Sequence, residues 1–89
     1  MCRNIRTLFN FDPPASDAEI RSASLQFVRK VSGMTNPSRG NEEAFEVAVE
    51  RISQSGSELL SVLETSAPPK NRVLEAARAR ALSAKRFGT

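Results

Sequence analysis

The stretch NEEAFEVAVERISQSGSELLSVLE at residues 41–64 decides the fold. Its apolar residues recur every three or four positions, so they form one continuous stripe along a helix. The stripe consists of Phe45, Ala48, Val49, Ile52, Gly56, Leu59, Leu60 and Leu63. At a rise of about 1.5 Å per residue, the segment predicts a helix on the order of 35 Å long. Such a helix is long enough to be the scaffold on which the rest of this 89-residue chain packs.

Both ends of this long helix carry their own signals. Asn41 is a typical N-cap residue, and Glu42 and Glu43 interact favourably with the helix dipole in the first turn. The segment SAPPKN at residues 66–71 ends the helix, because two prolines block its continuation. Gly56 lies on the apolar stripe, where glycine costs about 1 kcal/mol relative to alanine. Its presence there predicts a close crossing with another helix.

A first helix is predicted over residues 16–33. Ser16 and Glu19 have the spacing of a capping box, in which each side chain satisfies a backbone amide of the other residue. The apolar face consists of Ile20, Ala23, Phe27, Val28 and Val31. Gly33 ends this helix, since glycine readily adopts the left-handed backbone conformation found at helix C-termini. An irregular loop then joins it to the long helix, and the two are predicted to lie antiparallel.

A third helix, rich in alanine and arginine, is predicted over residues 71–87, with Asn71 as its N-cap. Its amphipathic pattern is weak, because Arg80 falls among the apolar positions and Leu82 points away from them. We expect residues 73–77 to pack on the long helix. The remainder is expected to be exposed, or ordered only by a partner.

Residues 1–15 are predicted to form an ordered arm. Four large apolar residues in this arm are suited to covering the open side of the helical pair, namely Ile5, Leu8, Phe9 and Phe11. The chain shows neither strand-like alternation nor an internal repeat. We therefore expect the all-α class: a single small three-helix domain over residues 1–89, with an ordered N-terminal arm, a long central helix and a basic C-terminal helix.

Charge is distributed unevenly along the chain, which has a net charge of +3. Residues 1–11 carry two arginines, for +2, while residues 12–69 hold five basic and nine acidic side chains, for −4. Residues 70–89 hold six basic side chains and one acidic side chain, for +5. Any partner that recognises positive charge is therefore predicted to bind the ends of the chain.

The composition excludes most familiar enzyme designs. There is no histidine, which is the commonest metal ligand and general base, and a single cysteine cannot form an internal disulfide. The first thirty residues lack an apolar run of signal-peptide length, and no segment approaches the roughly 18 apolar residues of a transmembrane helix. These features favour a cytoplasmic, non-enzymatic protein that holds no metal or cofactor and does not bind a membrane.

Cys2 is the one candidate for covalent chemistry. Removal of the initiator methionine would place its thiol beside a free α-amine, which can act as the base for its own side-chain nucleophile. Arg3 and Arg6 would lower the pKa of the thiol if they lay close to it in space. These residues point to a thiol-dependent enzyme or redox sensor. The alternative is a thiol that only packs, which is favoured by the lack of a histidine to serve as a second base.

Two further sets of residues point to binding. The third helix offers cations that would neutralise phosphates of nucleic acid or the ribosome, namely Arg72, Arg78, Arg80, Lys85 and Arg86. The alternative is a solvated helix, since the chain has no tyrosine or tryptophan on which bases could stack. Leu25, Val47 and Val62 fall outside the core stripes, and exposed apolar residues on so small a domain suggest an interface with a partner protein or a second copy. The alternative is that they are isolated apolar residues of the surface.

Three stretches carry a family resemblance: MCRNIRTLFNFDPPAS at residues 1–16, LQFVRKVSG at residues 25–33 and APPKNRVLEAARARALSAKRFG at residues 67–88. Together they resemble an uncharacterised bacterial family, domain of unknown function 2277. The resemblance implies no activity, cofactor, partner or functional residue. It does imply that the chain is a complete protein with its true start at Met1, so that the position of Cys2 is a property of the protein.

The leading functional hypothesis is a small non-enzymatic interaction module that acts through protein–protein contacts, with a homodimer among its forms. Binding of nucleic acid or the ribosome through the third helix is the first alternative. Thiol chemistry at Cys2 is the second.

Overall fold

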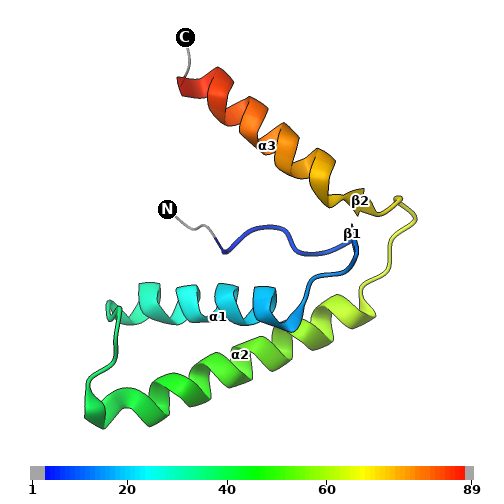
Figure 1. The fold of residues 1–89 in the computed structure, drawn as a ribbon. Helices are drawn as coiled ribbons and strands as arrows, with labels where there is room; N and C mark the ends of the chain where they lie inside the picture. The colour runs from blue at the N-terminus through cyan, green and yellow to red at the C-terminus, as the bar shows by residue number, and fades with distance from the viewer. Residues whose placement is uncertain (1–3, 88–89) are drawn as a thin grey trace.

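The protein folds as three helices and an N-terminal arm (Figure 1). The computed structural model describes the backbone of residues 4–87 and the side chains of residues 4–82. The helices are α1 (Asp17–Ser32), α2 (Glu42–Val62) and α3 (Arg72–Phe87), with a 3-10 turn, η1 (Arg39–Asn41), before α2. Two short strands, β1 (Phe11–Asp12) and β2 (Lys70–Asn71), pair in parallel. The predicted all-α class is confirmed, with this small pair of strands as an addition.

The limits of α1 follow from local chemistry, as predicted. The backbone amide of Glu19 donates to Ser16 Oγ at 3.2 Å, and the amide of Ser16 donates to Glu19 Oε1 at 3.0 Å, which completes the capping box. Gly33 closes the helix with a φ of 73°, and its amide donates to the carbonyl of Arg29 at 3.0 Å. Both signals act between residues close in sequence, so the sequence is sufficient to find them.

Of the two predicted asparagine caps, one forms and the other does not. Asn71 Oδ1 accepts from the amide of Leu74 at 3.0 Å and caps α3. Asn41 makes no cap, because η1 runs directly into α2 and gives Asn41 a helical backbone, with φ −111° and ψ −2°. An N-cap residue needs an extended backbone to turn its side chain toward the first-turn amides. Asn41 Nδ2 instead donates to Ser38 Oγ at 2.8 Å.

The core lies where α1 crosses α2, and it is small. Three hydrophobic side chains are buried within the described residues, namely Ile20, Val28 and Val49. Ser24 is buried among them, and its hydroxyl donates to the carbonyl of Ile20 at 2.9 Å. Phe27 and Val31, predicted for the same face of α1, remain 47% and 68% exposed. They stay exposed because α1 and α2 form a single layer, whereas a compact domain packs two layers around its core.

Gly56 lies at this crossing, but the crossing does not require glycine. A Cβ atom added at Gly56 would lie 3.5 Å from Cγ2 of Ile20, which is an ordinary van der Waals contact. We therefore expect Gly56→Ala to raise the free energy of unfolding by about 1 kcal/mol, the difference in helix propensity. Urea denaturation of the two proteins measures this change. A loss of stability would show that α1 and α2 approach more closely than this structure has them.

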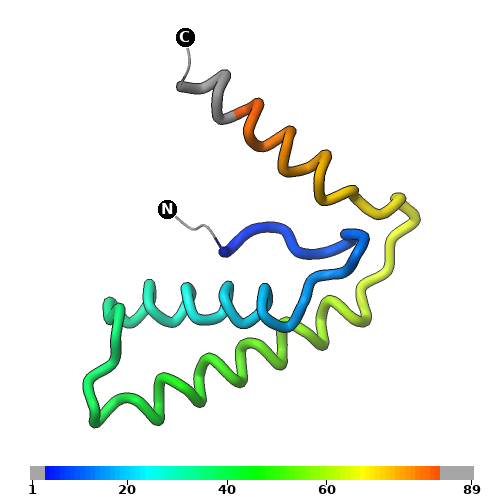
Figure 2. Tube along the Cα trace, in the orientation of Figure 1, coloured from blue at the N-terminus to red at the C-terminus, as the bar shows by residue number. Residues whose placement is uncertain are grey.

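The third helix points away from the other two, which gives the molecule an open, flat shape (Figures 1 and 2). The principal-axis extents are 45 × 38 × 16 Å, and the radius of gyration is 15.8 Å. A compact domain of this length would have a radius of gyration of about 12 Å. The predicted packing of residues 73–77 on α2 is wrong: Val73 is 74% exposed and Leu74 is 65% exposed. The cause is β2, whose pairing with β1 directs the chain away from α2 immediately before α3 begins.

The N-terminal arm connects the helical pair to α3. Its beginning lies along α1, where the amides of Asn4 and Ile5 donate to Gln26 Oε1 at 2.8 and 3.1 Å. Further along, Leu8, Phe9 and Phe11 are half-buried. The arm is ordered over its described residues, but it leaves part of the helical pair uncovered, since Phe27 and Leu59 stay exposed beside it.

The end of the arm clamps the segment that leads into α3. Asn10 adopts a left-handed backbone with φ 66°, which asparagine tolerates better than most residues. Its side-chain amide donates to the carbonyls of Ala67 and Pro68, at 3.4 and 3.2 Å, and its own carbonyl accepts from the amide of Lys70 at 2.8 Å. The Asp12–Pro13 peptide bond, two residues further along, is cis. These contacts fix where α3 begins.

Candidate interaction surface

Glu19 is the residue that joins the arm, α1 and α3. Its Oε1 accepts from the amide of Ser16 in the capping box, and its Oε2 accepts from Arg72 Nη1 at 3.0 Å and from Arg6 Nη2 at 3.2 Å. The carboxylate is only 23% exposed, and the side chain of Arg72 is 29% exposed. Hydrogen bonds to a charged group contribute more to stability than neutral ones, and more so when water is partly excluded. This cluster is therefore the polar anchor of α3.

The pKa of Glu19 reflects this surrounding. The hydrogen bond from the backbone amide of Ser16 and then that from Arg72 lower the pKa of its carboxyl group from 4.5 to about 2. Both bonds favour the ionised form, and together they outweigh the partial burial that opposes it. Glu19 is thus ionised throughout the pH range in which most proteins are folded.

Arg72 also lies on an aromatic ring. Its guanidinium carbon is 5.2 Å from the centroid of Phe11, and Nζ of Lys70 is 5.4 Å from the same centroid. Arg72 Nε donates to the carbonyl of Pro13 at 2.8 Å. Cations over an aromatic face gain electrostatic stabilisation from the ring quadrupole. Phe11 therefore serves as the platform on which the root of α3 rests.

The predicted basic candidates consequently fall into different groups. Arg72 is engaged by Glu19 in a partly buried contact, whereas Arg6 bonds to the same carboxylate with a side chain that is 51% exposed. Arg78 and Arg80 are exposed, and Arg78 lies 3.5 Å from Glu75 one turn earlier. The side chains of Lys85 and Arg86 lie outside the described residues, as do Cys2 and Arg3.

The three predicted interface residues do not form one patch. Val47 and Val62 are exposed, at 40% and 71%, whereas Leu25 is half-buried on α1. Leu25 contributes to the wall of a polar pocket instead. The sequence pattern identified residues outside the core stripes, but it did not show whether they are neighbours.

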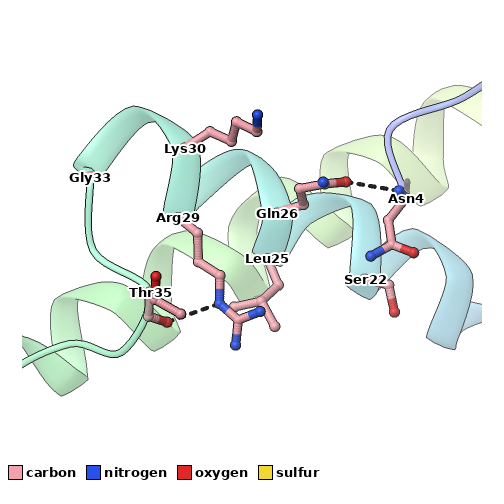
Figure 3. Close-up of a pocket in the computed structure, with 8 residues that line it drawn as sticks. All are labelled: Asn4, Ser22, Leu25, Gln26, Arg29, Lys30, Gly33 and Thr35. Carbon is pink, nitrogen blue, oxygen red and sulfur yellow. Dashed lines mark hydrogen bonds between the residues drawn. The ribbon is translucent and has the colours of Figure 1, made fainter. Parts of the chain in front are cut away.

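That polar pocket lies between α1, the start of the arm and the loop after α1 (Figure 3). Its volume is about 570 Å³. Gln26 accepts from the arm amides, and Arg29 Nε donates to the carbonyl of Thr35 at 2.9 Å. Lys30 extends away from Arg29. The hydrogen bonds of Gln26 and Arg29 hold the arm and the loop in place. This structural role explains why polar side chains line the pocket, and no ligand is needed to explain it.

A second pocket is an apolar groove, which we call the arm–α2 groove. It is about 300 Å³ in volume and lies between the arm and α2, over the inner face of α1. Its main apolar lining consists of Ile5, Leu8, Ala23, Phe27, Ile52 and Leu59. Ala23 and Gly56, which also lines it, are small, so the groove is deep enough to admit side chains from a helix laid along it.

The described part of α3 carries a matching apolar strip, which we call the α3 stripe. It consists of Val73, Leu74, Ala77 and Ala81. These residues follow one another at helical spacing, so they share one side of the helix, and all four are exposed. Arg78 and Arg80 lie to either side of Ala77. Residues 73–77 were expected to pack on the long helix, so an exposed apolar stripe on this part of α3 was not predicted.

Comparison with known proteins places the chain in a family. Residues 1–78 match the family described as "Uncharacterized conserved protein (DUF2277)". The chain belongs to the DUF2277 family. No curated protein and no solved structure matches it.

The extent of the DUF2277 match bears on the site. The matched residues include the arm, both helices of the hairpin, Glu19 and the root of α3 at Arg72. They also include three of the four residues of the α3 stripe, namely Val73, Leu74 and Ala77. The residues that hold the root of α3 therefore lie within the part of the chain that the family match covers.

Proposed function

We propose that this protein is a non-enzymatic binding module that acts in the cytoplasm through contacts between α3 and a partner protein. The observation that carries the proposal is the imbalance between buried and exposed hydrophobic residues. Within the described residues, three hydrophobic side chains are buried, whereas eleven large ones are at least 39% exposed. Exposed apolar surface on this scale is typical of a protein–protein interface.

The position of α3 supports the same proposal. The cluster around Glu19 and the stack on Phe11 hold the root of the helix firmly, while Val73 and Leu74 project into solvent. A rigidly held helix loses little conformational freedom when it binds, so it binds more tightly than a flexible segment with the same side chains. The contacts of Arg72 with Glu19 and Phe11 add little to the hydrophobic core, and we propose that their role is to hold α3 in position for a partner.

Membrane binding through a spanning segment finds no support, because none of the helices within residues 4–87 has the length and apolar character to cross a bilayer. Nucleic-acid binding has less support than protein binding. Arg72 is occupied by Glu19 and Pro13, and the exposed α3 residues nearest to it are apolar.

Photo-crosslinking tests the proposal. A photoreactive phenylalanine analogue at position 74, in the α3 stripe, is expected to form protein adducts in cells that express the chain. The same analogue at position 79 is the matched control, because Ala79 is exposed on the same helix but lies five residues from Leu74 and therefore on the other side of it. Adducts should disappear when Ala77→Asp is added. Adducts removed by nuclease but not by protease, or no adduct at position 74, would contradict the proposal.

A further inference from the structure

We infer that the partner of α3 is a second copy of this chain, and that two copies exchange their third helices, each α3 lying in the arm–α2 groove of the other. This inference rests on the proposed function, since it names the protein to which α3 binds. Four observations support it: the area left exposed, the match between stripe and groove, the distribution of charge, and the direction of α3.

The exposed area is that of a subunit rather than of a compact monomer. The structure exposes 7131 Å² for a mass of 9.7 kDa. A compact monomer of this mass would expose about 5,100 Å², roughly 2,000 Å² less. Two copies that buried this excess in each other would cover roughly 4,000 Å², which lies within the range of obligate homodimers. A second copy thus supplies the missing second layer over α1 and α2.

The α3 stripe and the arm–α2 groove fit each other in chemistry. The groove is lined mainly by apolar side chains, and its rim includes Phe27 and Leu59, which are 47% and 54% exposed. The stripe offers Val73 and Leu74 as large apolar side chains and Ala77 as a small one that permits close approach. An amphipathic helix in an apolar groove is a recurrent mode of recognition.

Charge favours the same pairing. Residues 4–72, which form the arm, the helical hairpin and the root of α3 bound to Glu19 and Phe11, hold eight basic and nine acidic side chains, for a net charge of −1. Residues 73–89 hold four basic side chains and one acidic side chain, for +3. Two copies that exchange α3 each bring a positive helix to a negative body, and such complementarity favours association and disfavours wrong partners. Each chain carries both a positive α3 and a negative body, so two copies can pair without any other protein.

The third helix cannot lie in the arm–α2 groove of its own chain. The bonds from Arg72 to Glu19 and Pro13, and the pairing of β1 with β2, hold the root of α3 so that the helix leaves the hairpin (Figure 1). In the view of Figure 1 the arm lies between α3 and α1. Exchange of an identical element between protomers is an inexpensive route to a closed, two-fold symmetric dimer.

Sedimentation equilibrium of the purified full chain tests the inference first. We expect a dimer, and we expect Val73→Asp together with Ala77→Asp to raise its dissociation constant by at least about tenfold, because both carboxylates would be buried in the groove. Ala79→Asp is the matched control, since Ala79 is exposed and lies six residues from Val73 and two from Ala77, which places it on the other side of the helix. It should leave the dimer intact. A monomeric full chain, or a dimer that survives the double substitution, would overturn the inference.

Disulfide trapping between two differently labelled copies tests the exchange itself. In a Cys2→Ser background, one copy carries Ala77→Cys and the other carries Phe27→Cys in the groove. Mild oxidation should link the two copies when they are mixed. Val47→Cys replaces Phe27→Cys in the control, because Val47 has a similar exposure of 40% but does not line the groove. Equal linkage to positions 27 and 47 would contradict an ordered exchange.

The two proposals fail in distinguishable ways. A purified chain that is monomeric, combined with adducts at position 74 to a different protein, overturns the exchange and leaves the binding module in place. The absence of protein adducts at position 74, combined with a monomeric chain, overturns both. Adducts at position 74 between two copies, with a dimer in solution, support both.

Discussion

Replacing Glu19 by alanine is expected to lower the free energy of unfolding by about 3 kcal/mol. Two losses add to give this value. The capping box at the start of α1 disappears, and removal of a cap costs about 1 kcal/mol. The guanidinium of Arg72 also loses its charged acceptor, and hydrogen bonds to charged groups contribute about 1.5 to 3 kcal/mol each. For a domain whose core contains so few buried side chains, this change is large.

The substitution Glu19→Gln separates the two losses. Glutamine can still complete a capping box, but it cannot neutralise Arg72 and Arg6. We therefore expect it to lower the free energy of unfolding by about 2 kcal/mol. Glu46→Gln is the control: Glu46 also pairs with an arginine, Arg21, but its side chain is 65% exposed. Exposed pairs of this kind contribute about 0 to 1 kcal/mol.

Urea denaturation of the four proteins measures these differences, and hydrogen exchange locates them. The amide of Lys70, which donates to Asn10 in the clamp, should exchange faster in Glu19→Ala because the root of α3 is then held by fewer bonds. Equal destabilisation by Glu19→Gln and Glu46→Gln would contradict the assignment of Glu19 as the anchor of α3.

Sequence reasoning found the features that depend on residues close to one another along the chain. The capping box at Ser16, the left-handed Gly33 and the cap at Asn71 all connect residues within four positions. Helical periodicity placed the stripe of α2, and its deepest member, Val49, is 1% exposed. Such signals need no knowledge of which elements meet in space.

The contacts that join α3 to the arm and to α1 were not predicted. Glu19 was recognised as half of a capping box, but its bond to Arg72 joins residues 53 positions apart. Likewise, Phe11 was expected to cover the helical pair, whereas it lies beneath Lys70 and Arg72. A basic side chain in a sequence does not show whether solvent, a phosphate or a carboxylate of the same chain will neutralise it.

The direction of α3 depends on the same distant contacts. Its composition predicted a helix, and one forms, but nothing in residues 71–87 shows which way the helix points. That direction is set by the pairing of Phe11 with Lys70 and by the bonds of Asn10 to the Ala67 and Pro68 carbonyls. The arm was predicted to cover the hairpin. In the structure it also holds the residues before α3, so that α3 points away from the hairpin.

Acid should weaken the fold through Glu19. A carboxyl group whose pKa is lower in the folded state stabilises that state at pH values above the pKa of the unfolded chain. The pKa of Glu19 is lowered from 4.5 to about 2, so its stabilisation is complete above about pH 5. It is then lost as the pH falls through 4.5 toward 2.

The size of this effect follows from the shift in pKa. Each pKa unit corresponds to about 1.4 kcal/mol, so the full shift would be worth about 3 kcal/mol. The carboxylate is 23% exposed, and solvent screening reduces the expected value to about 2 kcal/mol.

The difference in unfolding free energy between the unmodified chain and Glu19→Gln isolates this contribution from those of the other carboxylates. We expect the difference to be about 2 kcal/mol at neutral pH and to approach zero near pH 2, where a protonated glutamic acid resembles glutamine. Urea denaturation at a series of pH values measures it. A difference that stays constant across this range would show that Glu19 supports α3 by its shape and hydrogen bonds alone. A difference that closes as the pH falls would show that the charge of Glu19 holds Arg72, and with it the root of α3, in place.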